Sequence, residues 1–439
     1  MKLIVRKSQT SGTVFVPGSK SHTIRAVFMA SLAKGKSKII SPLISDDAFS
    51  AANTCTMLGA EIEMREENMQ GKNSPVWYVR GVGNNPRLPE DVINVGNSGT
   101  TLRFALPVAA LIEEGCSIFT GDSQIRRRPL GPLVQSMNDL GAQAFFAKGN
   151  GCAPVIVKGV LKGGNTSLDS VTSQFLSSLL ITCPILQNDT NINVTRLNEV
   201  PYVEMTLWWL RKLGIEIENN NLKTLFIPGK QSYSPFECCI PGDFSSATFF
   251  IVQAAISGSS FTLKNLDMTD PQGDKRVIEI LNQMGAEVVF SHDGITVTGT
   301  GKLKAMEIDM NDIPDALPAM AVAGCFAEGE TRLVNVPQAR MKETDRIHVM
   351  KTELSKMGAD IVELNDGLII RKSKLKGCHV NGHGDHRVVM ALAVAALNAE
   401  GETIIDTAEA MSVTFPEFTD IMIKCGAGME LAEKGDELK

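Results

Sequence analysis

Four cationic side chains stand at or near the start of segments whose apolar spacing predicts helices: Lys20, Arg25, Arg103 and Arg387. Small and hydroxyl residues that favour helix N-caps surround them, as in the segment Gly18–Thr23. A cation is disfavoured at the positive end of a helix dipole unless an anion lies beside it. Exposed backbone amides and Lys or Arg side chains together form an anion site. Because one helix dipole contributes only ~0.3–1 kcal/mol, several helix starts must converge to hold a polyanion tightly.

Two further clusters carry cations. The run Arg126–Arg128 opens a second predicted helix, although three consecutive arginines are also typical of a solvated surface patch. In the other cluster, Lys342 and Arg346 lie four residues apart, so on a helix they would face the same way. Glu343 lies between them and offers a proton-transfer group. A surface salt-bridge ladder would give the same spacing, so both interpretations stay open here.

The motifs of several cofactor-dependent and covalent mechanisms do not occur in this sequence. No GxGxxG follows a strand, and GxxxxGK[ST], HExxH, paired CxxC and GxSxG are missing. The segment His383–His386 could bind a metal, but a helix cap is the favoured interpretation. The residues therefore predict small anionic substrates held by fixed cations, without a metal, a cofactor or a covalent nucleophile.

The composition is that of an ordinary globular protein of 439 residues, with 43% hydrophobic and 21% charged residues and a net charge of −6. It is too apolar for a disordered chain, and no apolar run approaches the ~18–20 residues of a membrane helix. The start does not resemble a secretory signal, and the net acidity argues against a nucleic-acid partner. The nine cysteines are typical of reduced thiols. We therefore expect a cytoplasmic protein with no membrane partner.

A sixfold internal repeat must position these residues. A helix-like run that ends in glycine and leads into an apolar strand recurs at Gly59, Gly141, Gly214, Gly285, Gly358 and Gly426. Glycine is expected there because it accepts the left-handed conformation that ends a helix. A turn with a short β-branched strand precedes each of these glycines, and another helix-like stretch precedes that turn. The alternation of helix and strand predicts an α/β fold, although periodicity alone would also suit other repeat proteins.

The repeat also predicts the domain organisation. Five of the glycines are followed by a returning strand, whereas the sixth repeat runs out of chain. The segment Thr13–Gly18 has the missing pattern, so we expect it to complete the last repeat. This predicts two domains of three repeats each, residues 20–240 and residues 1–19 with 241–439. The chain would cross twice between them, and the crossings could act as a hinge.

Six motifs in this order resemble the 5-enolpyruvylshikimate-3-phosphate synthase family: NSGTT-x-R, RRPLG, TSQF, IPDA, KETDR and DHR. The resemblance runs from Pro17 to Pro416, nearly the whole chain. It implies two similar domains, each of three βαβαββ units with pseudo-threefold symmetry, that close over a cleft. It also implies transfer of the carboxyvinyl group of phosphoenolpyruvate to the 5-hydroxyl of shikimate 3-phosphate, with release of phosphate and no metal or cofactor. The shikimate pathway and aromatic amino-acid biosynthesis would be its setting, and we expect a monomer.

The resemblance also implies a role for individual residues. The shikimate 3-phosphate site would comprise Lys20, Ser21, Arg25, Thr172, Ser173, Gln174, Asp315, Gln338 and Lys342. The phosphoenolpyruvate site would comprise Lys20, Gly99, Arg128, Arg346 and Arg387. Asp315 would deprotonate the 5-hydroxyl, Glu343 would supply the proton that turns a methylene into a methyl, and Lys20 would contact both substrates. Glyphosate competes with phosphoenolpyruvate in this family, and Gly99 has no side chain to crowd that pocket.

Two departures and two alternatives remain at this point. Glu199 stands where some family members have Ser, which puts a direct phosphate contact there in doubt, and Val413 stands where some have a cation. The sister carboxyvinyl transferase acting on UDP-N-acetylglucosamine usually has a reactive Cys at the position that Ser123 occupies here. A non-catalytic repeat scaffold that binds anions would need only the cations. It would not need Asp315 and Glu343 as paired carboxyl groups.

Overall fold

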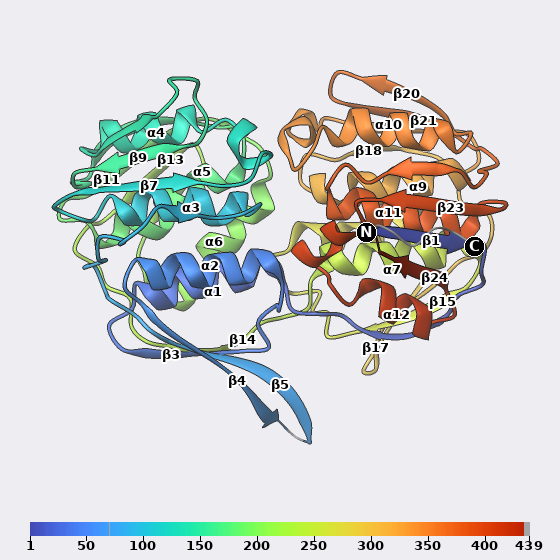
Figure 1. Ribbon diagram of the computed structural model, residues 1–439, viewed down its shortest axis with the longest axis horizontal. Helices are drawn as coiled ribbons and strands as arrows, with labels where there is room; N and C mark the ends of the chain where they lie inside the picture. The colour runs from blue at the N-terminus through green and yellow to red at the C-terminus, as the bar shows by residue number, and fades with distance from the viewer. Residues whose placement is uncertain (70, 434–439) are drawn as a thin grey trace. The chain divides into compact units, whose positions relative to one another are not determined.

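The structure is a computed structural model that describes residues 1–69 and 71–433 (Figure 1). The chain forms two compact units. One, here called the N-terminal unit, is Gly18–Pro241, and the other, the C-terminal unit, is Met1–Pro17 with Gly242–Lys439. Six four-stranded sheets with both parallel and antiparallel pairs accompany the helices of the described residues. The predicted α/β class is therefore confirmed.

One repeat of the N-terminal unit illustrates the topology of all six. Its elements, in chain order, are β6 (Ile93–Asn94), α3 (Gly99–Ala109), β7 (Cys116–Thr120), α4 (Gly131–Asp139), β8 (Gln143–Phe146) and β9 (Val155–Lys158). The strand order is β6-β7-β9-β8, with a parallel pair β6–β7 and antiparallel pairs beyond it. The parallel pair needs α3 as its crossover, so the start of α3 follows the end of a sheet strand directly.

The other two repeats of the N-terminal unit have the same order of sheet strands. One comprises α1 (Lys20–Ser31), β3 (Lys36–Ile40), α2 (Asp46–Met57), β4 (Glu61–Met69), β5 (Lys72–Arg80) and β14 (Glu237–Cys239). The other comprises β10 (Gly164–Ser170), α5 (Ser173–Thr182), β11 (Thr190–Leu197), α6 (Val200–Lys212), β12 (Glu218–Asn220) and β13 (Thr224–Ile227). Their sheets read β14-β3-β5-β4 and β10-β11-β13-β12.

The C-terminal unit repeats this plan. Its first repeat comprises β2 (Gly12–Phe15), α7 (Phe244–Ser257), β15 (Ser260–Lys264), α8 (Arg276–Met284), β16 (Glu287–Ser291) and β17 (Gly294–Thr298). The second comprises β18 (Glu307–Asp309), α9 (Leu317–Phe326), β19 (Glu330–Val334), α10 (Arg346–Lys356), β20 (Asp360–Leu364) and β21 (Gly367–Arg371). The third comprises β22 (His379–Asn381), α11 (His386–Asn398), β23 (Glu402–Asp406), α12 (Phe418–Lys424), β24 (Gly428–Ala432) and β1 (Lys2–Arg6).

Two strands join a sheet far from their neighbours in sequence. β2 precedes α1 in the chain but pairs in parallel with β15, whereas β14 precedes α7 but pairs in parallel with β3. The expectation that the segment Thr13–Gly18 completes the last repeat is therefore wrong. β1 completes that sheet instead, between β23 and β24. Its run Leu3–Val5 is buried and suits a central strand, whereas β2 alternates and lies at a sheet edge.

The six predicted helix ends are confirmed. Each glycine of the repeat follows the second helix of its repeat with a positive φ, between 74° at Gly214 and 115° at Gly285. By contrast, the first helix of each repeat is buried on all sides. α7, α9 and α11 pack against one another with nearly every residue buried, and they form the centre of the C-terminal unit. The starts of these helices therefore lie at the interior of the unit, where polar side chains need partners.

Candidate active site

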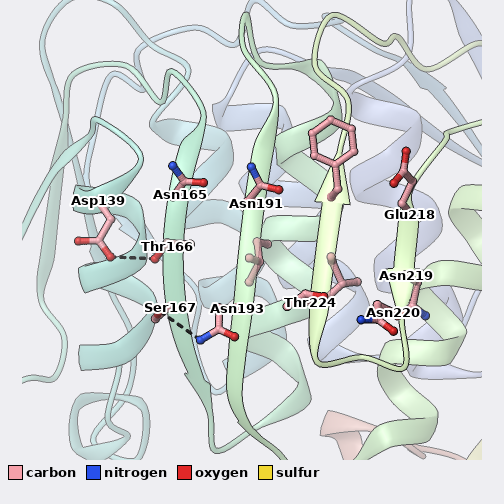
Figure 2. Close-up of a pocket in the computed structure, with 13 residues that line it drawn as sticks. Asp139, Asn165, Thr166, Ser167, Asn191, Asn193, Glu218, Asn219, Asn220 and Thr224 are labelled. Carbon is pink, nitrogen blue, oxygen red and sulfur yellow. Dashed lines mark hydrogen bonds between the residues drawn. The ribbon is translucent and has the colours of Figure 1, made fainter.

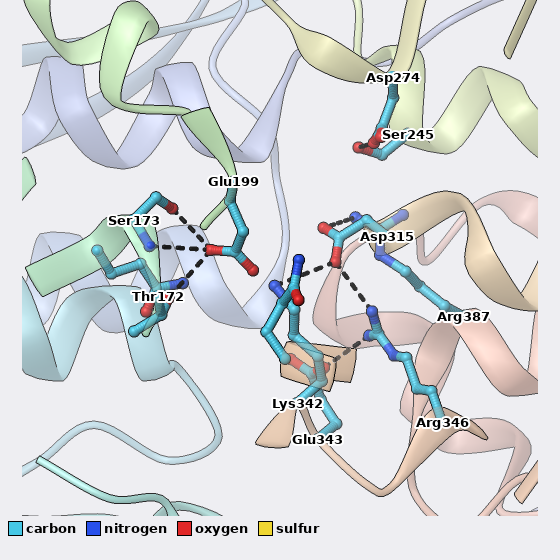
Figure 3. A network of polar contacts seen from close by, with 12 residues as sticks. Thr172, Ser173, Glu199, Ser245, Asp274, Asp315, Lys342, Glu343, Arg346 and Arg387 are labelled. Atoms are coloured by element: carbon cyan, nitrogen blue, oxygen red, sulfur yellow. Dashed lines mark hydrogen bonds and ion pairs between the residues drawn. The ribbon is translucent and has the colours of Figure 1, made fainter. Parts of the chain in front are cut away.

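A buried arginine gathers three carboxylates in the C-terminal unit, and Figure 3 shows two of them, Asp315 and Glu343. Arg346, the first residue of α10, is 1% exposed. Its Nη1 donates to Asp315 Oδ1 at 2.9 Å, its Nη2 to Glu343 Oε2 at 2.6 Å, and its Nε to Asp385 Oδ2 at 2.8 Å. Asp385 also caps α11 by accepting from the backbone N of Arg387, as the cap interpretation predicted. One guanidinium therefore fixes the starts of three segments relative to each other.

Asp315 is the carboxylate that most cations approach. It lies in the short helical turn Pro314–Ala316 before α9, and its side chain is only partly exposed. Arg387 Nη2 lies 3.0 Å from Oδ2, and Lys342 Nζ lies 3.7 Å from Oδ1. The structure therefore brings together Asp315, Lys342, Glu343, Arg346 and Arg387, all of which the sequence singled out. Three positive and three negative side chains, counting Asp385, lie in this cluster.

The electrostatics of the two arginines follow from this cluster. Burial alone would lower the pKa of Arg346, but the charges of Asp385, Glu343 and Asp315 outweigh it and raise that pKa above its ordinary value. Burial likewise opposes the charge of Arg387, and Asp315 is the main group that raises its pKa. Both guanidiniums are therefore permanently charged, and they provide fixed positive charge in a dry environment.

Asp274 is another buried carboxyl group in this unit, and the sequence did not single it out. Ser245, near the start of α7, donates its hydroxyl to Asp274 Oδ2 (Figure 3). The pKa of Asp274 is raised to about 7, mainly by burial and then by the charge of Asp315, while Arg387 and the hydrogen bond from Ser245 oppose the rise. The sequence gives only a weak signal for Asp274, because a single Asp in a polar loop cannot be told from an ordinary turn residue.

The local structure around Lys342 differs from the expectation. The segment 342–345 is not helical, because Asp345 accepts from the backbone N of His348 at 3.0 Å and starts α10 only at Arg346. Lys342 and Arg346 therefore do not share a helix face, although both reach Asp315. Gln338 is buried in the turn Pro337–Met341, where its Nε2 donates to the carbonyl of Asn311 at 3.1 Å.

In the N-terminal unit, the start of α5 is occupied by a carboxylate (Figure 3). Glu199, only 1% exposed, accepts through Oε2 from the backbone N of Ser173 at 3.1 Å and from Ser173 Oγ at 2.8 Å. The same oxygen accepts from Thr172 Oγ1 at 3.1 Å. This is the contact pattern of an anion at a helix N-terminus. The sequence marked Glu199 as a departure but did not predict this contact.

Arg25 is a buried cation held by neutral oxygens. Its Nη2 donates to the carbonyl of Tyr202 at 2.8 Å, its Nη1 to the carbonyl of Ser21 at 3.0 Å, and its Nε to Thr206 Oγ1 at 2.9 Å. Thr206 in turn donates to Ser177 on α5 at 2.9 Å. Burial lowers the pKa of Arg25 to about 10, since no described carboxylate forms an ion pair with it. A bound anion would compensate this charge.

Two arginine side chains lie at the start of α3, and one of them reaches the start of α5. Arg103 Nη1 donates to Gln174 Oε1, and Arg128 Nη2 donates to Asn97 Oδ1 at 3.4 Å. A Cβ on Gly99 would lie 2.6 Å from Arg128 Nη1 and 2.8 Å from Arg103 Nη1. A side chain at this place would therefore have to displace the ends of two arginine side chains. Arg128 is the only buried residue of the run Arg126–Arg128.

Lys20 is the first residue of α1, and its Nζ lies 3.1 Å from Asp47 Oδ2 at the start of α2. Asp47 is buried and was not singled out from the sequence. Its signal was weak, because acidic residues in the first turn of a helix are ordinary stabilisers of the dipole. Ser21 follows Lys20 in the same turn. Each unit thus presents cations at helix starts, as the pattern of charges predicted.

A different hollow of about 750 Å³ lies over the sheet β10-β11-β13-β12 (Figure 2). Amide side chains line much of it, including Asn165, Asn191 and Asn193. None of the residues predicted for the site lines this hollow. Within residues 1–69 and 71–433, no cluster of His, Cys, Asp and Glu has the arrangement of a metal site. No helix of these residues is long and apolar enough to cross a membrane.

Comparisons with known proteins identify the family. Residues 4–422 match the family model of EPSP synthase (3-phosphoshikimate 1-carboxyvinyltransferase). A 3-phosphoshikimate 1-carboxyvinyltransferase of Acetivibrio thermocellus is 64% identical over 433 residues, 99% of this chain and 100% of that protein. One of Ruminiclostridium cellulolyticum is 59% identical over 98% of this chain and 100% of its own length. The solved EPSP synthase from Acinetobacter baumannii superposes with a TM-score of 0.81 at 27% identity, over 99% of this chain and 100% of that one. The chain therefore belongs to the EPSP synthase (3-phosphoshikimate 1-carboxyvinyltransferase) family.

Proposed function

We propose that the chain transfers the carboxyvinyl group of phosphoenolpyruvate to the 5-hydroxyl of shikimate 3-phosphate and releases inorganic phosphate. Membership of the family carries this conclusion, since relatives named for the activity match at up to 64% identity over their full length. The reaction belongs to the shikimate pathway, which leads to the aromatic amino acids. Both substrates are phosphorylated carboxylates, so fixed cations at helix starts suit them.

The residue assignments within this function are our proposal. Shikimate 3-phosphate is assigned to Lys20, Ser21, Arg25, Thr172, Ser173, Gln174, Asp315, Gln338 and Lys342. Phosphoenolpyruvate is assigned to Lys20, Gly99, Arg128, Arg346 and Arg387. Support comes from Arg25, a buried cation whose described partners are neutral oxygens, and from the close approach of Arg128 to Gly99.

The proposed chemistry is an addition followed by an elimination. Asp315 takes the proton of the 5-hydroxyl as its oxygen bonds to C2 of phosphoenolpyruvate, and Glu343 gives a proton to C3, which becomes a methyl group. In the elimination, phosphate leaves C2 and the Glu343 carboxylate takes back a proton from C3, so the carbon–carbon double bond forms again. Cations stabilise the charge of the phosphate and carboxylate throughout.

Asp315 is held by cations that this proposal also assigns to the substrates. Lys342, Arg346 and Arg387 lie within 3.7 Å of its carboxylate. Glu343 shares Arg346 with Asp315, so both proton-transfer groups have a common support.

One assay tests the proposed reaction. Phosphate release from phosphoenolpyruvate is measured with shikimate 3-phosphate, with UDP-N-acetylglucosamine, and with neither. We expect release only with shikimate 3-phosphate. Release with the UDP-sugar would select the sister transferase, and release with neither would favour a non-catalytic anion-binding scaffold.

Variants test the two proton-transfer roles. We expect Asp315→Ala and Glu343→Gln each to reduce kcat by about 10²–10⁴-fold, the usual contribution of a positioned acid or base. Asp312→Ala is the matched control, because Asp312 lies three residues away and pairs at 3.7 Å with exposed Arg276. Turnover of Asp315→Ala or Glu343→Gln equal to that of the control would refute the role of that residue. A monomeric state and a cytoplasmic location remain predictions, the first of which gel filtration tests.

A further inference from the structure

The carboxylate of Glu199 takes the hydrogen bonds that a phosphate oxygen would take at the start of α5. Its Oε2 accepts three donors within 3.1 Å, two of them from Ser173 and one from Thr172. α5 has no acidic residue in its first turn, and Thr172 makes no capping bond with its own side chain. An anion contributed by another element therefore compensates the positive end of this helix.

The backbone of Glu199 is arranged for this contact and not for its own helix. Glu199 occupies the N-cap position of α6, where its side chain makes no capping bond. Its φ of 59° and ψ of 45° are left-handed, a conformation that is unfavourable for a residue other than glycine. This conformation turns the carboxylate away from α6 and toward α5. The left-handed backbone of Glu199 thus accompanies the contact of its carboxylate with Ser173.

Arg25, a buried cation with no carboxylate partner among the described residues, lies next to the same helix. Arg25 donates to the carbonyl of Tyr202, in the first turn of α6, and to Thr206, which donates to Ser177 one turn beyond Ser173. The described residues give Arg25 only neutral partners, although it is buried. Arg25 is thus a cation linked through Thr206 to Ser177, one turn along α5 from Ser173, while Glu199 holds the hydroxyl and amide donors.

We propose that Glu199 is a specificity-determining residue that competes with the phosphate of shikimate 3-phosphate for the donors of Thr172 and Ser173. A dianionic phosphate and a carboxylate cannot share one set of donors without strong repulsion. Glu199 must therefore leave Ser173 when the phosphate binds, and the energy of its three hydrogen bonds is subtracted from the affinity. This inference rests on the proposed function, which assigns Thr172 and Ser173 to shikimate 3-phosphate.

Glu199→Gln tests the competition, because glutamine keeps the size and one acceptor oxygen but removes the charge. We expect its dissociation constant for shikimate 3-phosphate, measured by calorimetry, to fall about tenfold, the equivalent of one charge-assisted hydrogen bond. The affinity for shikimate, which lacks the phosphate, should stay unchanged. Glu204→Gln is the matched control, since Glu204 is exposed on α6 and pairs with Arg211 at 3.8 Å.

The outcomes separate this inference from the proposed function. Wild-type protein that releases no phosphate with shikimate 3-phosphate would contradict the function. Wild-type protein that turns over normally, while Glu199→Gln binds shikimate 3-phosphate no more tightly than Glu204→Gln, would overturn the competition. If Glu199→Gln does not fold, a crystal structure of the wild-type complex decides. A phosphate oxygen at the amide of Ser173 is expected, and a carboxylate of Glu199 still bound there would overturn the inference.

Discussion

Replacement of Arg346 should destabilise the C-terminal unit, in addition to any effect on substrate binding. Arg346 donates four hydrogen bonds to three carboxylates. One of these carboxylates, that of Asp385, is fully buried. Arg346→Gln removes the positive charge and leaves these carboxylates to repel one another. Arg346→Lys keeps the charge but loses the planar fork that reaches all three.

The expected magnitudes follow from burial. Removing one partner of a buried ion pair costs about 3–5 kcal/mol, because the remaining charge is left uncompensated. Glutamine can retain about 1 kcal/mol through a single hydrogen bond. We therefore expect Arg346→Gln to lower the free energy of unfolding by about 3 kcal/mol and Arg346→Lys by less. Arg371→Gln is the control, because Arg371 is 46% exposed although it pairs with Glu330 at 2.6 Å, and an exposed pair contributes under about 1 kcal/mol.

The distribution of aromatic residues supplies the assay. Trp77, Trp208 and Trp209 all lie in the N-terminal unit, so tryptophan fluorescence reports the unfolding of that unit alone. Circular dichroism reports the helices of both units. In urea, Arg346→Gln should lose part of its helical signal at a lower concentration, with no change in fluorescence at that step. A free energy of unfolding within 0.5 kcal/mol of Arg371→Gln, close to the usual error of such comparisons, would refute the role of the buried network.

Two further predictions concern pH and the Gly99 position. The fold favours the protonated form of Asp274, so the stability that this group contributes is complete near pH 4 and is lost as the pH rises through about 7. The free energy of unfolding of Asp274→Asn relative to wild type should therefore increase by about 2 kcal/mol between pH 5 and 7. A constant difference would contradict the raised pKa. Gly99→Ala should displace Arg103 and Arg128 and raise the inhibition constant of glyphosate by about tenfold or more. Gly131→Ala should leave the constant unchanged, because its Cβ would meet nothing within 4 Å. Equal constants for the two variants would refute the steric argument.

The repeat was predictable from the sequence because its signals are local. A glycine that ends a helix needs a positive φ whatever surrounds it, and all six of these glycines have one. The strand pairing was less predictable, because it joins segments that are far apart in the chain, and the pattern of one segment does not name its partner. Thr13–Gly18 resembled the missing strand, yet the more apolar β1 fills that place.

The cations of the site were predictable for a similar reason, and their partners were not. Lys20 and Arg387 are unusual at helix starts, so the sequence marks them. Asp47 and Asp274 are ordinary in that position or in a loop, and only burial distinguishes them. Glu199 looked like a lost contact, because nothing in its neighbourhood in sequence indicates that its carboxylate reaches another helix.

Because β1 and β2 belong to the sheets of the C-terminal unit, the two units differ in whether a continuous fragment contains all their strands. A fragment that begins at Gly242 would lack β1, so β23 and β24 would lose the strand that joins them, and it would leave β15 with a bare edge. A fragment from Gly18 to Pro241 keeps all three of its sheets. The N-terminal unit can therefore fold during synthesis from its own residues. The C-terminal unit also needs β1 and β2, which are synthesised first and must stay unpaired until this unit is complete.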